Sequence, residues 1–339
     1  MQNKLAGPPG HKTSIAQLTA PVKNSGSDFR KTPHHAGFAL PSLQFKIVFS
    51  GFFVFLCGLA ALREIQSINP FAPRAILRYT QFMTLDSVHT TCIGIDIAPS
   101  RRPFSYAALG SDKRLLAMGQ CQILEMLAFI SGQQQALIAL NAPFRPNQGL
   151  MQQDEVRAAF APRPTGSHWT DLRVAEYQLH AAGITVPHTP AREKDCHGWQ
   201  RHGFTLAQNF SGYGFQQYAS TEDAPLQMLE TQTDAIFHLL TGHAPAEDRL
   251  LEGRLQRQML LHEHDMPVTD PMDLFEEITR FRLLKGELAI NNVLSTGELN
   301  ALMAAWLAWL AVNEPGKVQK FGTAEEGEIY LPLAKEQGF

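Results

Sequence analysis

Residues 91–98, with the sequence Thr-Cys-Ile-Gly-Ile-Asp-Ile-Ala, decide the fold that we expect for this chain. Three isoleucines and a cysteine make the stretch an almost continuous apolar run, and β-branched residues are enriched in strands. A half-exposed strand would alternate apolar and polar residues, so this run predicts a strand that is buried on both faces. The stretch therefore indicates the first, central strand of an α/β sheet.

One carboxylate, Asp96, lies inside this apolar run. A buried carboxylate is costly unless it is paired with a partner or holds a cation. Two interpretations stay open for it. Asp96 is either a strand-end residue that accepts hydrogen bonds from nearby backbone N–H groups, or a metal ligand at the end of the strand.

The composition limits the classes of function. The chain has 339 residues, of which 44% are hydrophobic and 18% charged, so it can bury a sizeable core in one large or two ordinary domains. Its net charge of −3 gives no overall basic field, and binding to nucleic acid would need a local basic patch. The cysteines show no CxxC spacing, and nothing in them demands an oxidising compartment.

The front of the chain, residues 1–82, reads as a leader. Residues 1–42 are poor in core residues and rich in Gly, Pro, Ser, Lys and His, which predicts disorder. Residues 43–62 are hydrophobic, but the continuous apolar part at 47–62 is shorter than the roughly 20 residues of a membrane-spanning helix.

Three interpretations of this leader stay open: a start assigned too early, with Met83 as the true start, an uncleaved membrane anchor through residues 43–62, or a peripheral helix. Lys and Arg are more numerous before the apolar run than after it, so an anchor would leave the rest of the chain outside the cytoplasm. We expect a cytoplasmic protein whose folded domain is residues 83–339. A membrane would be a partner only if residues 43–62 are a real anchor.

The periodicity after Met83 predicts a definite order of elements. Strands are expected at 91–97, 104–109 and 114–119, then a helix that stops near Gly132 and a buried strand at 136–140. Three strands joined by tight turns, a crossover helix and a fourth strand parallel to the first form the order of an RNase H-like core. Actin-like ATPases and sugar kinases share this order, but the residues after Asp96 make a poor phosphate cradle. In the RNase H-like order, Asp96 and Asn141 would lie side by side at the carboxyl ends of the first and fourth strands, where open α/β sheets bind ligands.

Several segments strengthen this interpretation because they occur together and in order. They are the run at 94–98, Asn141-Ala-Pro, the segment from Arg173 through Glu176 to Ile184, Glu230 with its following helix, and the tail from Ala301 to the Glu-Gly-Glu-Ile-Tyr-Leu-Pro-Leu of 326–333. This ordered set resembles the family known as domain of unknown function 429, which is described as predicted nucleases of RNase H-like fold. The similarity covers about residues 88–335.

The resemblance implies a Mg²⁺- or Mn²⁺-dependent nuclease with four acidic positions in its catalytic site. Asp96 and Glu230 match two of them and would be the metal ligands. Asn141 and Asn300 stand where the family has Asp, so they would be secondary ligands or groups that position water. Two carboxylates and two amides would hold a second metal ion weakly or not at all. The alternative is a catalytically inactive RNase H-like module that binds nucleic acid or protein.

The middle of the chain, about residues 144–225, is expected to be an insertion of helices and loops over the site, because it is too long for an ordinary loop. Arg145, Arg173 and Trp169 are our candidates for substrate binding, through contacts with the phosphates and bases of a nucleic acid. The alternative for Arg173 is an ion pair with Glu176, three residues further along a helix.

The C-terminal half predicts a strand at 226–230 that ends at Glu230, a helix to Leu240, amphipathic helices at 249–264 and 271–285, and a buried helix at 297–312. Between residues 299 and 312 only Asn300 is strongly polar. Asn300 and Glu298 point in different directions around this helix, so only one can face a given site. A last strand at 328–333 is expected at a sheet edge because it contains Pro332.

Overall fold

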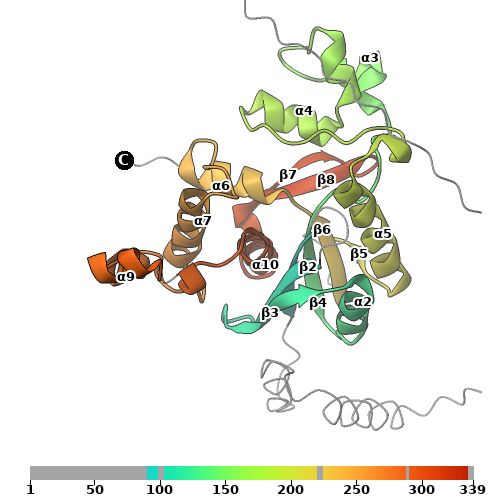
Figure 1. The fold of residues 1–339 in the computed structure, drawn as a ribbon. Coiled ribbons are helices and arrows are strands. Elements are labelled where there is room, and N and C mark those ends of the chain that lie inside the picture. The colour runs from blue at the N-terminus through green and yellow to red at the C-terminus, as the bar shows by residue number, and fades with distance from the viewer. Residues whose placement is uncertain (1–89, 98–102, 220–223, 288–289, 335–339) are drawn as a thin grey trace, which may run out of the picture. The chain divides into compact units, whose positions relative to one another are not determined.

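The computed structural model describes residues 90–97, 103–219, 224–287 and 290–334. The leader expected at 1–82, with its hydrophobic segment at 43–62, lies outside these residues. The described residues have an α/β fold in which helices flank one mixed sheet (Figure 1). This confirms the fold class predicted from the sequence.

The strands among the described residues form one eight-stranded sheet in the order β3-β2-β1-β4-β6-β8-β7, with β5 paired to β6. Their bounds are β1 Thr91–Asp96, β2 Phe104–Leu109, β3 Leu115–Cys121, β4 Ala136–Asn141, β5 Gln216–Gln217, β6 Leu226–Glu230, β7 Val318–Thr323 and β8 Gly327–Pro332. β1 is antiparallel to β2 and parallel to β4, and β4 is parallel to β6. This is the arrangement of an RNase H-like core.

The two faces of β1 are buried by different helices. Ile93 and Ile95 pack in a core cluster that includes residues of α2 (Ile123–Ser131) and α5 (Gly198–Gly212). On the opposite face, Cys92 belongs to the core cluster formed mainly by α10 (Thr296–Asn313), with α6 (Thr233–Thr241) and α7 (Leu251–Glu263). The near-continuous apolar pattern of the strand therefore reflects burial on both sides.

The helix α10 is buried, as the sequence predicted, and it crosses directly over β1, which was not predicted. Twelve of its residues are buried. A Cβ atom added to Gly94 would lie 2.0 Å from the carbonyl oxygen of Ala301 and 2.2 Å from the backbone nitrogen of Ala305. Only glycine allows this approach. Among the described residues, Ile290–Asn313 is also the one helical segment long and apolar enough to cross a membrane, and it is 67% buried within the domain.

The predicted insertion consists of helices and loops, as expected. It contains α3 (Asp154–Ala158), α4 (Val174–Ala181), α5 and the short strand β5, with 3-10 turns η2 (Leu150–Gln152), η3 (Ser167–Asp171) and η4 (Glu193–Asp195) between them. Further 3-10 turns flank α10, namely η5 (Ile290–Asn292) and η6 (Pro315–Lys317).

Two predictions about the C-terminal half were wrong. The single helix expected at 271–285 is two short helices, α8 (Asp273–Glu277) and α9 (Arg280–Lys285), because Thr279 is extended and its side chain accepts a hydrogen bond from the Arg282 backbone N–H, which starts a new helix. The last strand, β8, is not at the sheet edge but lies between β6 and β7. Pro332 is tolerated there because it is the final residue of β8, beyond the one register pair that joins β8 to β6.

Candidate functional site

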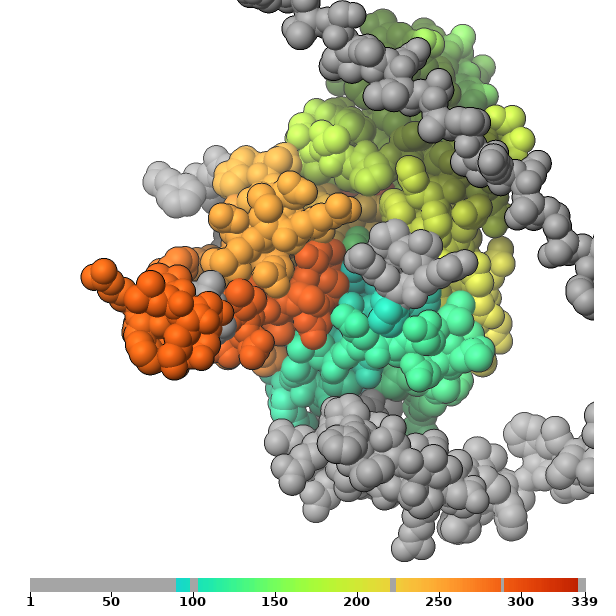
Figure 2. All heavy atoms as spheres, in the orientation of Figure 1, coloured from blue at the N-terminus to red at the C-terminus, as the bar shows by residue number. Residues whose placement is uncertain are grey.

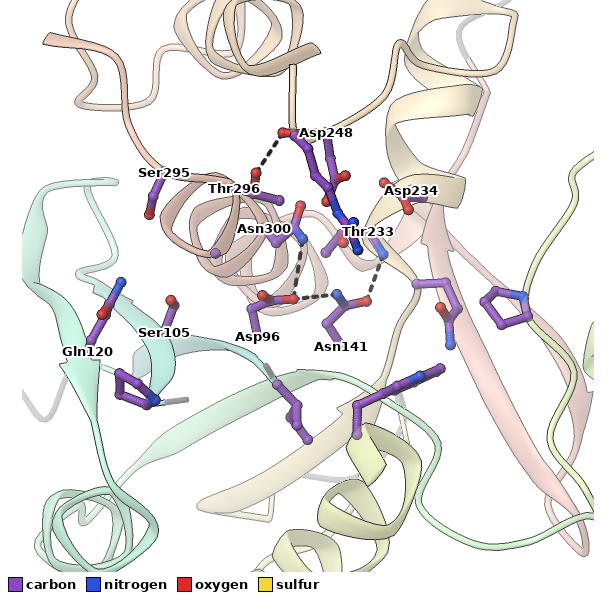
Figure 3. A pocket seen from close by; sticks show the side chains of 17 residues that line it. Asp96, Ser105, Gln120, Asn141, Thr233, Asp234, Asp248, Ser295, Thr296 and Asn300 are labelled. Atoms are coloured by element: carbon purple, nitrogen blue, oxygen red, sulfur yellow. Dashed lines mark hydrogen bonds between the residues drawn. The ribbon is translucent and has the colours of Figure 1, made fainter. Parts of the chain in front are cut away.

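A cavity of about 540 Å³ opens at the carboxyl ends of β1 and β4. The register of these parallel strands places Asp96 beside Asn141, and α10 brings in Asn300 from above. Figure 3 shows the three side chains converging. The rest of the lining is mainly polar and comes from the sheet, α5, α6, the loop before α7 and the start of α10: Ser105, Gln120, Trp199, Gln232, Thr233, Asp234, Asp248, Arg249, Ser295 and Thr296, among others.

Asp96 accepts hydrogen bonds from the two asparagine side chains that the sequence analysis predicted at the site. The side-chain N–H groups of Asn141 and Asn300 donate to the same oxygen, Asp96 Oδ1, at 2.7 and 3.3 Å. Asn141 Oδ1 in turn accepts a hydrogen bond from the backbone N–H of Thr233, the first residue of α6, at 3.0 Å. This chain of hydrogen bonds joins β1, β4, α6 and α10 around one carboxylate.

The surroundings of Asp96 disfavour its negative charge. Burial raises the pKa of Asp96 to about 6, against the effect of the two asparagine hydrogen bonds, and the charges of Asp234 and Asp248 raise it further. Strongly perturbed carboxylates in cavities are frequent at functional sites. A bound cation would relieve this unfavourable environment.

Two oxygens at the centre of the site accept no hydrogen bond from the part of the chain that the structure describes. Asn300 is only 9% exposed, and its Oδ1 atom is buried without a partner. Asp96 Oδ2 receives no hydrogen bond from any residue that the structure describes, whereas Oδ1 receives two. Of the two, Asn300 Oδ1 is the buried atom, and a buried acceptor without a donor costs free energy, so such an atom usually has a ligand, an ion or a water molecule beside it.

Two acidic residues of the cavity, Asp234 and Asp248, were missed by the sequence analysis. Asp234 lies in the first turn of α6 and pairs with the buried guanidinium of Arg257 at 2.9 Å. Asp248 lies in the loop between α6 and α7, where its backbone oxygen accepts a 2.7 Å hydrogen bond from the Thr296 hydroxyl. In Figure 3 both lie beyond Asn300 and Thr233 as seen from Asp96. The position of Asp234 after a strand was a usable signal, but Asp248 lies in a loop with no local motif.

The structure does not bring Glu230 to this cavity. Glu230 is 1% exposed, and its carboxylate accepts hydrogen bonds from the guanidinium of Arg173 and, at 3.0 Å, from the backbone N–H of Phe144. Burial lowers the pKa of Arg173, but Glu230 and Glu176 outweigh burial and raise it. Since its charge is already compensated by Arg173, Glu230 is placed as part of a structural ion pair, separate from Asp96.

The three residues that we expected to bind substrate also lie outside the cavity lining. Arg173 is fully buried and binds Glu176 as well as Glu230, which agrees with the alternative of an ion pair along the helix. Arg145 donates to the backbone oxygen of Glu325 at 3.0 Å, and Trp169 packs on Tyr177. Instead, Trp199 from α5 and Arg249 from the loop before α7 line the cavity.

The two polar side chains in the first turns of α10 point in different directions, as the sequence analysis predicted. Glu298 accepts a 2.8 Å hydrogen bond from the backbone N–H of Ser295 and so caps its own helix, whereas Asn300 lines the cavity. Within the described ranges, no three His, Cys, Asp or Glu side chains lie close enough together to hold a metal ion. A cation here would therefore be held by Asp96 together with amide and water oxygens.

Similarity to known proteins gives no further guide to the chemistry of this cavity. No family model, no curated protein and no solved structure matches this chain. The resemblance to domain of unknown function 429 stays a prediction, and function has to be inferred from the side chains of the cavity.

Proposed function

We propose that this chain is a metal-dependent nuclease, or a nuclease-like phosphodiester hydrolase, that uses a Mg²⁺ or Mn²⁺ ion at Asp96. One observation carries the proposal: Asp96 Oδ2 receives no hydrogen bond from the described residues, and the neighbouring Asn300 Oδ1 is buried without a donor. Carboxylate and amide oxygens are ligands for these ions. A cation would satisfy both oxygens and offset the charge of Asp96.

The charge of the cavity supports a cation in the same place. Asp96, Asp234 and Asp248 line it, with Asp234 paired to Arg257, and among the described residues Arg249 is the lining residue of opposite charge. A phosphate group would be repelled by these carboxylates unless a cation lay between them. When bound, such an ion would polarise a phosphate oxygen and lower the pKa of a bound water molecule.

Other side chains of the cavity would bind and orient the substrate. Arg249 forms no ion pair with any described residue, so its guanidinium is available for a phosphate oxygen. Trp199 offers an aromatic surface on which a base can stack. Asn141 is bonded to Asp96 on one side and to Thr233 on the other, so it fixes the direction of the carboxylate.

The test is cleavage of single- and double-stranded DNA and RNA by the full-length protein with Mg²⁺, with Mn²⁺, or with a chelator. We expect cleavage that needs the ion and that Asp96→Ala lowers at least about 100-fold, since one electrostatic group in an active site contributes on this scale. The matched control is Glu155→Ala, which removes an exposed carboxylate of α3 and should cleave like the wild type. Cleavage that survives Asp96→Ala would contradict the proposal.

A second candidate, the catalytically inactive binding module, is favoured by one specific observation. Glu230, the second acidic residue of the family pattern, is already paired with Arg173, and Asn141 and Asn300 hold amides where carboxylates are usual. This candidate predicts salt-dependent binding of nucleic acid without cleavage. The discriminating variant is Asn141→Asp/Asn300→Asp. Cleavage by this variant alone would favour the binding module, and cleavage by the wild type would exclude it.

A further inference from the structure

A surface far from the cavity concentrates exposed apolar side chains. Among the described residues, twelve large hydrophobic residues are exposed, and five of them fall within residues 272–284. We call these five the α8–α9 surface: Met272, Phe275, Phe281, Leu283 and Leu284. Single exposed apolar residues are ordinary, but a group of large ones on adjoining helices marks an interaction site.

The helix α9 has no face packed against its own domain. Every residue from 279 to 287 is exposed, including Phe281 at 64% and Leu284 at 81%. In Figure 1, α9 lies on the far side of α7 from the sheet, and Figure 2 shows the same orange segment standing out from its surroundings. A helix of six residues is marginal without packing on one of its faces. The α8–α9 surface therefore needs a partner that packs against it.

The charges beside this surface indicate what covers it. α8 carries the acidic residues Asp273 and Glu276, whereas α9 carries the basic residues Arg280 and Lys285. Glu277 of α8 and Arg282 of α9 already pair with each other at 2.7 Å and are not counted. A two-fold axis through the surface would place α8 of each chain against α9 of the other, so that the opposite charges meet twice. An anionic membrane would attract α9 but repel α8.

We propose that the occupant is a second copy of this chain, in an isologous dimer through the α8–α9 surface. Phe281 and Leu284 would be its anchors, because they are the most exposed apolar residues of the surface and aromatic anchors carry much of the energy of interfaces. The proposal goes beyond the function of the cavity and is independent of it, since none of the five residues lines the cavity.

The first measurement is sedimentation of the full-length protein over a range of concentrations. We expect a reversible dimer that Phe281→Asp/Leu284→Asp weakens at least about 100-fold, because charged groups would then have to be buried in the interface. Both side chains are exposed in the described chain, so the variant should unfold at the same urea concentration as the wild type. A wild type that stays monomeric up to about 100 μM overturns the proposal.

The second measurement tests the charge complementarity directly. Asp273→Lys/Glu276→Lys makes α8 basic, and Arg280→Glu/Lys285→Glu makes α9 acidic. Each variant alone should be monomeric, because like charges would meet across the two-fold axis. An equal mixture of the two should form a heterodimer, because the reversed α8 then faces the reversed α9 of the partner and the unreversed helices face each other, in both cases with opposite charges.

The control is Lys194→Glu/Arg201→Glu, which makes the same change of charge on exposed residues of η4 and α5 and should dimerise like the wild type. The proposal is overturned if both charge-reversed variants still associate, because that association would not use the α8–α9 surface. Association through the leader would give this result. So does a mixture that stays monomeric. Binding of monomeric wild type to phosphatidylserine vesicles, lost on reversal of α9, would assign the surface to a membrane instead.

Discussion

The environment of Asp96, the central residue of the cavity, lowers the stability of the fold when this carboxylate is charged. Its pKa is raised to about 6, chiefly by burial, so the folded protein binds this proton more tightly than the unfolded chain does. The stability of the fold therefore falls as the pH rises from about 4 to about 6, and the full cost is present above pH 6. Sites that sacrifice stability in this way are frequently functional.

Replacing Asp96 with Asn should recover this stability. Asn keeps the shape and an oxygen that can accept from Asn141, but it removes the charge. We expect Asp96→Asn to raise the free energy of unfolding by up to about 3 kcal/mol above pH 6 and to lose this advantage as the pH falls toward 4. Urea unfolding at several pH values measures the effect. A gain that is equal at pH 4.5 and pH 7.5 would count against the assigned environment.

Glu230 should behave as a structural residue and not as a ligand. Glu230→Gln removes one partner of a buried ion pair with Arg173, so we expect it to lower the free energy of unfolding by about 3 kcal/mol. Below the melting temperature, the same variant should bind Mn²⁺ within about twofold of the wild type, because Glu230 does not line the cavity. A Glu230→Gln protein that is as stable as the wild type but does not bind Mn²⁺ would contradict this expectation and favour Glu230 as a metal ligand.

At the scale of elements, the sequence predicted what depends on local pattern. The period of the apolar residues was enough for β1, β2, α2, β4, β6 and α10. The choice of Asn300 over Glu298 came from the family resemblance and not from the pattern of the helix. The sequence analysis failed for contacts between residues that are far apart in the sequence. Nothing local shows that Arg173 meets Glu230, that the loop with Asp248 and Arg249 folds over the cavity, or that β7 covers β8.

The crossing of α10 over β1 gives the sharpest test at this scale. The Cβ atom of Gly94→Ala would overlap backbone atoms of Ala301 and Ala305, which cannot move without moving the helix. We expect a loss of about 3 kcal/mol or more in the free energy of unfolding. Gly132→Ala is the control, since its Cβ would lie 3.6 Å from the nearest atom, the Phe129 oxygen, and should change stability by less than about 0.5 kcal/mol. Equal effects in calorimetric melts would contradict the close crossing.

At the scale of the whole molecule, the chain divides at residue 83, with Met83–Phe339 as one compact unit. Asp96 and Asn300, 204 residues apart in sequence, both belong to this unit. The order β3-β2-β1-β4 was predictable because the connection rules leave few topologies for these elements, whereas β7 was missed and β8 was expected at the sheet edge. The site was only partly predictable, since its rim comes from loops.

Residues 83–339 should therefore express as a soluble protein that unfolds in one cooperative transition. Circular dichroism during heating measures this, and aggregation or a broad, gradual loss of helix would contradict it.

The most direct test of the central claim is calorimetric titration of Mn²⁺ into the full-length protein. We predict saturable binding of one ion per chain that Asp96→Ala abolishes and Asn300→Ala weakens about tenfold, as expected for the loss of one ligand oxygen. The control Glu155→Ala should bind like the wild type. Absence of saturable binding, or binding that Asp96→Ala leaves unchanged, would contradict a cation site at Asp96.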